Sequence, residues 1–68
     1  MRSVVLRRAD ERARGRAWFL TLSPAERGDL GDAFVLAGFG HEEWGFETRP
    51  SEAFLAGADA ARMLWEAM

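Results

Sequence analysis

At 68 residues the chain has room for one domain and one hydrophobic core, so we expect a single domain over residues 1–68. The absence of cysteine excludes disulfides and thiolate metal sites, and a single histidine excludes most histidine-based metal clusters. A formal net charge of −2 and apolar runs far shorter than a membrane span favour a cytoplasmic protein that does not enter a membrane. We therefore expect no cofactor and a core built from the three tryptophans and five phenylalanines.

Two segments near the N-terminus show the alternation of apolar and polar residues that is typical of β-strands. Val4 and Leu6 fall on one face of residues 3–8, and Trp18 begins an alternating apolar face in residues 16–22. A charged link that ends in glycine separates the two segments. This pattern predicts a β-hairpin with a loose loop.

A capping motif marks the beginning of the first predicted helix. Ser23 can accept from a free backbone N–H, Pro24 suits the first helical position, and Glu26 can reach back to the residue 23 N–H. We expect this helix to end at Gly38, which can adopt the left-handed conformation, with Phe39 folded back onto the helix.

A third strand and a second helix complete the predicted fold. Trp44 and Phe46 alternate with polar residues in residues 41–48, and Ser51 caps a final helix. One stripe of that helix carries the apolar residues Phe54, Ala58, Ala61, Trp65 and Met68. The expected fold class is α+β, in the order β-β-α-β-α, with a three-stranded antiparallel sheet packed against two helices.

The charges are distributed unevenly along the chain. The first 22 residues carry six arginines against two acids, whereas the remainder carries three arginines against nine acids. The basic part predicts an anion-binding ribbon for nucleic-acid phosphates, formed by Arg7, Arg8, Arg12, Arg14 and Arg16. The simpler interpretation is a solvated hairpin whose arginines discourage edge-to-edge aggregation, and the acidic overall balance argues against nucleic acid as the partner.

The acidic part predicts a surface that contacts a basic groove on another protein. Its members are Glu26, Asp29, Asp32, Glu42, Glu43 and Glu47. Such a surface, the small size and an arginine-only basic composition typical of a GC-rich bacterial or phage genome favour a non-enzymatic regulator or inhibitor. The expected kind is a phage-encoded, anti-CRISPR-like, anti-defence protein. The alternative explanation is that carboxylates are simply favoured on exposed helices and near helix N-termini.

Small and apolar residues outside the predicted core faces raise a third hypothesis, a homodimer or structural oligomer. The residues concerned are Gly28, Gly31, Val35, Leu55 and Met63. Scattered exposed apolar residues are also normal in monomers. His41-Glu42-Glu43 is the one group that resembles a reactive centre, but adjacent residues rarely converge on one ion or substrate, so we expect no enzymatic activity.

Overall fold

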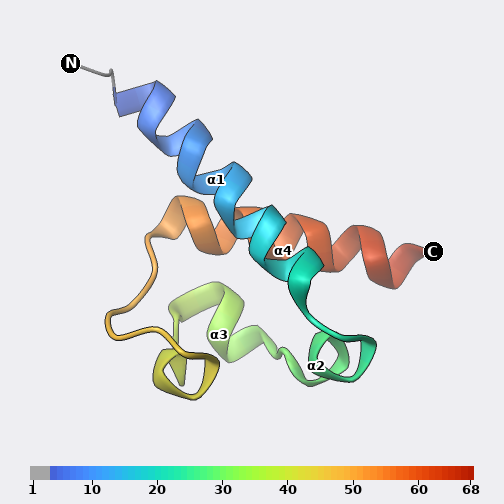
Figure 1. Cartoon of the computed structure of the whole chain (residues 1–68). Coiled ribbons are helices and arrows are strands. Elements are labelled where there is room, and N and C mark those ends of the chain that lie inside the picture. Colours follow the sequence, from blue (N-terminus) through green and yellow to red (C-terminus); the bar gives the residue numbers. More distant parts are fainter. Residues whose placement is uncertain (1–3) are drawn as a thin grey trace.

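The computed structural model describes residues 4–68, and within that range every regular element is a helix (Figure 1). The expected α+β fold with a three-stranded antiparallel sheet is therefore wrong. The elements in chain order are α1 (Val4–Thr21), α2 (Pro24–Asp29), α3 (Asp32–Ala37), the 3₁₀-helix η1 (His41–Trp44) and α4 (Glu52–Ala67). None of the helices in the described residues is both long enough and apolar enough to cross a membrane.

Helix α1 replaces the predicted hairpin, apart from residue 3, which lies outside the described residues. Five of the seven residues in the supposed link, residues 9–15, are alanine, arginine or glutamate, which have high helix propensity, so the link continues the helix instead of turning the chain. Trp18, Phe19 and Leu22 follow helical spacing from Gly15 and face the core, whereas Leu20, expected beside Trp18, is exposed.

Helices α1 and α4 cross at unusually close range because a glycine of each faces the backbone of the other. A Cβ atom on Gly15 would overlap the carbonyl oxygen of Phe54, and a Cβ atom on Gly57 would overlap the carbonyl oxygen of Arg12. Any larger residue at either position would separate the two helices. Figure 1 shows α1 passing across α4 at this point, with the N-terminal part of α1 extending beyond the crossing.

The predicted first helix begins as expected but is divided in two. The Oγ of Ser23 accepts from the Glu26 N–H at 3.2 Å, and the Ser23 N–H donates to the Glu26 carboxylate at 2.8 Å. Leu30 and Gly31 then adopt extended backbone conformations, which end α2 and begin α3. The interruption directs Leu30 into the core, where it is buried.

The end of α3 and the following segment are shaped by glycines. Gly38 ends α3 with a φ of 73°, which confirms the expected left-handed cap. Phe39, however, does not fold back onto α3 and is exposed. The predicted third strand is wrong, because Gly40 and Gly45, at φ 76° and 89°, bracket a short 3₁₀-helix in residues 41–44.

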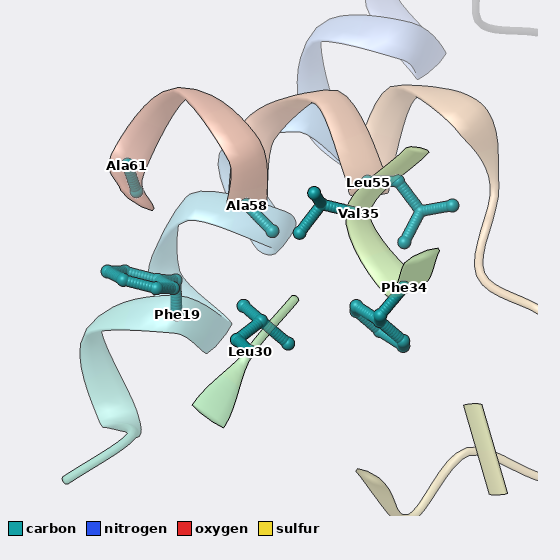
Figure 2. Close-up of a cluster of buried hydrophobic side chains, with 7 residues drawn as sticks. All are labelled: Phe19, Leu30, Phe34, Val35, Leu55, Ala58 and Ala61. Atoms are coloured by element: carbon teal, nitrogen blue, oxygen red, sulfur yellow. The ribbon is translucent and has the colours of Figure 1, made fainter. Parts of the chain in front are cut away.

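Helix α4 begins as predicted, with the Ser51 Oγ accepting from the Phe54 N–H at 3.1 Å. Its buried face is rotated relative to the predicted stripe, because the crossing with α1 places Gly57 and its neighbours inward. Leu55 is therefore buried, whereas Met68 at the end of the stripe is exposed. Figure 2 shows the buried side chains of α1, α3 and α4 and the α2–α3 junction together: Phe19, Leu30, Phe34, Val35, Leu55, Ala58 and Ala61.

Trp18 organises a second group of aromatic rings beside this core. Its ring centroid lies 5.3–5.9 Å from those of four other rings, at the edge-on and tilted angles that aromatic pairs favour. These rings belong to Phe34, Trp44, Phe46 and Phe54. One side chain of α1 thus joins α3, η1, the following loop and α4.

Replacing either crossing glycine by alanine is expected to destabilise the fold. Gly15→Ala and Gly57→Ala each force a Cβ into a carbonyl group, and we expect a loss of about 2–3 kcal/mol or more in the free energy of unfolding. Urea unfolding followed by far-UV circular dichroism measures this loss.

Gly28→Ala is the matched control, because a Cβ on this α2 glycine would meet no atom within 4 Å. At that site alanine should stabilise the helix by about 0.5–1 kcal/mol. Equal effects of all three substitutions would contradict the close crossing.

Candidate functional site

The residues of the predicted acidic surface lie on α2, at the start of α3, and on η1 and the loop after it. In Figure 1 these segments lie together on the side of α4 opposite the N-terminal half of α1. These acidic residues therefore belong to segments on the other side of α4 from the N-terminal half of α1, which carries Arg7, Arg8 and Arg12. The acidic residues extend from α2, which carries Asp29, to η1, which carries Glu42.

Two of the six acidic residues hold the fold together. Glu26 closes the capping box of α2, and its hydrogen bonds with the Ser23 backbone and side chain hold the pKa of its carboxyl below the ordinary value. Asp32 accepts from Arg62 of α4 at 2.7 Å. The sequence predicted the capping role of Glu26, which the structure confirms, but it did not predict the contact between Asp32 and Arg62.

Arg62 is the polar link between α4 and the α2–α3 junction. Only 13% of its side chain is exposed, and it contacts Asp32 at 2.7 Å, Asp59 at 3.0 Å and the Leu30 carbonyl at 3.4 Å. Burial acts to lower the pKa of Arg62, but the hydrogen bonds and charges of the two aspartates outweigh it and raise the pKa. A charge so enclosed is stable only with both partners in place.

The η1 end of the molecule forms a shallow groove of about 470 Å³ with an exposed phenylalanine at its side. Phe39 is 75% exposed, and the carboxylates of Glu42 and Glu43 line the same groove. The left-handed turns at Gly38 and Gly40 on either side of Phe39 produce this arrangement. We call Phe39, Glu42, Glu43 and the neighbouring Glu47 the acidic end.

Arg49, which is exposed and lines the same groove, holds the acidic end in place. Its Nε donates to the carbonyl oxygen of Ala37 at 2.7 Å, which satisfies the last turn of α3. The side chain lies so close to Gly38 that a Cβ there would overlap it. The position of Phe39 is thus fixed by glycine geometry and a hydrogen bond, while its own ring remains exposed.

The potentially reactive groups of this region are engaged in local contacts. The Nδ1 of His41 lies 3.3 Å from the Gly38 carbonyl oxygen, and its Nε2 lies 3.8 Å from the Glu42 carboxylate. Elsewhere, at the end of α1, the Thr21 hydroxyl donates to the Trp18 carbonyl at 2.6 Å. Within the described part of the chain, no three metal-ligating side chains come together.

The arginines predicted to form a hairpin ribbon lie instead along α1. Arg7, Arg8, Arg12, Arg14 and Arg16 are all exposed. Arg14 contacts Glu11 at 3.6 Å. Arg12 borders two grooves between α1 and α4, one of about 460 Å³ near the start of α4 and one of about 310 Å³ beyond the crossing.

The residues of the predicted oligomer interface are divided between surface and core. Gly28 and Gly31 are exposed, with open space where a side chain would lie, and Met63 is also exposed. Val35 and Leu55, expected on the outside, are buried in the core, because the division of the first predicted helix and the close α1–α4 crossing turn them inward.

The sequence did not predict the exposure of three apolar side chains: Leu36, Phe39 and Leu64. The sequence signal for Phe39 was present in its position between two glycines, which predicts a sharp turn as readily as a fold-back onto the helix. Leu36 and Leu64 offered no comparable signal, because their exposure depends on which helix faces pack together.

Comparison with protein-family models, with curated proteins and with solved structures found no similar protein. The functional argument therefore depends on the surfaces of the molecule.

The Glu26 contact predicts a pH-dependent contribution to stability. Folding lowers the pKa of Glu26. Its carboxylate therefore stabilises the protein at pH values above 4.5, the ordinary pKa of the group, and this contribution is lost as the pH falls through the pKa of the folded state. Glu26→Gln keeps a hydrogen-bonding side chain but removes the charge. We expect the free energy of unfolding of wild type to exceed that of Glu26→Gln at neutral pH, with the difference vanishing in acid.

Urea unfolding of both proteins between pH 7 and pH 3 checks this expectation. Glu66→Gln, on the exposed side of α4, controls for the loss of one negative charge elsewhere. Parallel pH profiles for wild type and Glu26→Gln would refute the proposed role of the charge.

Proposed function

We propose that this protein is a non-enzymatic regulator or inhibitor that binds a basic groove of another protein through its acidic end. The observation that carries the proposal is the exposed ring of Phe39 beside Glu42 and Glu43. A cytoplasmic, phage-encoded, anti-defence role belongs to the same proposal.

An exposed phenylalanine with an acidic border has the composition of a protein-binding site. Large aromatic side chains supply much of the binding energy at protein interfaces when a pocket of the partner encloses them. Charged groups around such an anchor select the partner and accelerate association. Phe39 would be the anchor, and Glu42, Glu43 and Glu47 would pair with basic residues of the partner.

The other members of the acidic group take different parts in the proposal. Asp29 is exposed and continues the negative surface onto α2, away from η1. Glu26 and Asp32 contribute charge while they also hold α2 and Arg62. Reversing either of these two charges therefore changes stability as well as binding, and they are poor choices for a test.

Binding through the acidic end is tested by affinity capture from cells, with the protein immobilised and retained proteins identified by mass spectrometry. Phe39→Ser and the double substitution Glu42→Lys/Glu43→Lys should each reduce retention of the specific partner by about tenfold or more, since each removes part of the anchor or its charges. Unfolding experiments establish that the variants are folded.

Glu66→Lys on α4 and Leu36→Ser on α3 are the matched controls, because both replace exposed residues outside the acidic end. Both should retain the partner as wild type does. A partner that is retained by every variant would contradict the proposed site.

The alternative function is binding to nucleic acid, and the exposure of five arginines on one helix favours it. Against it, Arg14 contacts Glu11, and Arg16 lines a groove with α4. The net charge of −2 also opposes association with a polyanion.

We expect fluorescence-anisotropy titrations with random duplex and single-stranded oligonucleotides to show no saturable binding at low salt. The reason is that the negative side of the molecule repels phosphates at long range when screening is weak. Binding that weakens steeply between low and moderate salt would instead assign the α1 arginines to phosphate contacts and favour the alternative.

A further inference from the structure

We propose that the groove between α1 and α4 beyond their crossing binds an acidic amphipathic helix of a partner protein. The groove has a volume of about 310 Å³ and is formed by Ala9, Arg12, Ala13, Arg16, Gly57, Ala60, Ala61 and Leu64. It contains no residue of the acidic end, so the inference is independent of the proposed function.

The walls of this groove are suited to the close approach of a third helix. The exposed alanines on both walls, Ala9, Ala13 and Ala60, leave room for another backbone, as small residues do wherever helices pack closely. Leu64 is 68% exposed and stands at the edge, where a partner side chain would cover it.

The groove favours a helical occupant over an extended one. Both walls are helices, whose backbone N–H and C=O groups are already paired along each helix. A strand gains affinity by pairing its backbone with an exposed sheet edge, and these walls offer no such edge. An amphipathic helix gains affinity from its apolar side chains, which is what an alanine- and leucine-lined groove accepts.

Charge determines the class of helix. Arg12 and Arg16 line the groove one helical turn apart, and neither forms an ion pair with another described residue. Arg12 also lines the neighbouring groove, where Arg7 and Arg8 lie together with the carboxylates of Glu11 and Glu52. Carboxylates along the edge of the bound helix would neutralise the guanidinium groups of Arg12 and Arg16.

The same features disfavour a second copy of this chain and nucleic acid as occupants of the groove. A second copy seated symmetrically would bring Arg12 and Arg16 of both copies against each other, because such an interface pairs identical patches. Nucleic acid would meet the arginines but leave the apolar floor without a partner, since no aromatic residue lines the groove for base stacking.

The test uses a fluorescein-labelled synthetic peptide of three heptads, with alanine and leucine on one face and glutamate along its edges. Fluorescence anisotropy should show saturable binding to the wild-type protein. Leu64→Asp and Arg16→Glu should each weaken binding by about tenfold or more, because one buries an unpaired charge and the other reverses an ion pair.

Met63→Asp and Arg14→Glu are the matched controls. Both introduce the same acidic residues at exposed positions of the same helices but outside the groove, and both should change the affinity by less than about twofold. Phe39→Ser, at the acidic end, should bind the peptide as wild type does. The peptide experiment can therefore fail without contradicting the proposed function, and the reverse also holds.

Four results would overturn the inference. The first is no binding of the acidic peptide, and the second is equal binding of a matched peptide with lysine in place of glutamate. The third is competition of an oligonucleotide with the peptide, which would assign the groove to nucleic acid. The fourth is a dimer in light scattering that Leu64→Asp dissociates, which would assign the groove to a second copy.

Discussion

The close crossing of α1 and α4 is the contact on which the rest of the structure depends. Gly15 of α1 lies against the Phe54 carbonyl of α4, and Gly57 of α4 lies against the Arg12 carbonyl of α1, so each helix contributes one glycine to the contact. Packing at this distance brings many backbone atoms into van der Waals contact and removes water from two helices that would otherwise be marginal alone. Phe19, Leu55 and the buried alanines of α4 can then share one core.

The shorter elements are held to this pair of helices by two different kinds of contact. Trp18 packs against rings from α3, η1 and α4, and supplies the apolar part of the attachment. Arg62 supplies the polar part through Asp32 and the Leu30 carbonyl. Helices of six residues, such as α2 and α3, have little stability of their own, so their positions depend on these contacts.

The resulting molecule has two surfaces of opposite charge and different construction. The acidic end is a turn shaped by glycines, from which one aromatic ring projects. The groove between α1 and α4 is bordered by rigid helices, with arginines at its border and alanines on its floor. Under the two proposals above, the acidic end contacts a basic partner and the groove contacts an acidic helix.

The sequence by itself determined where the capped helices begin, because Ser23 and Ser51 act through hydrogen bonds only three residues away. It also determined the left-handed cap at Gly38. Tertiary structure decided the N-terminal element: the residues around Trp18 fit both a two-residue and a helical period, and the close crossing of α1 and α4 at Gly15 and Gly57 favours the helix. Packing likewise placed Leu55 inside, since the choice of the buried helix face depends on contacts between residues distant in the chain.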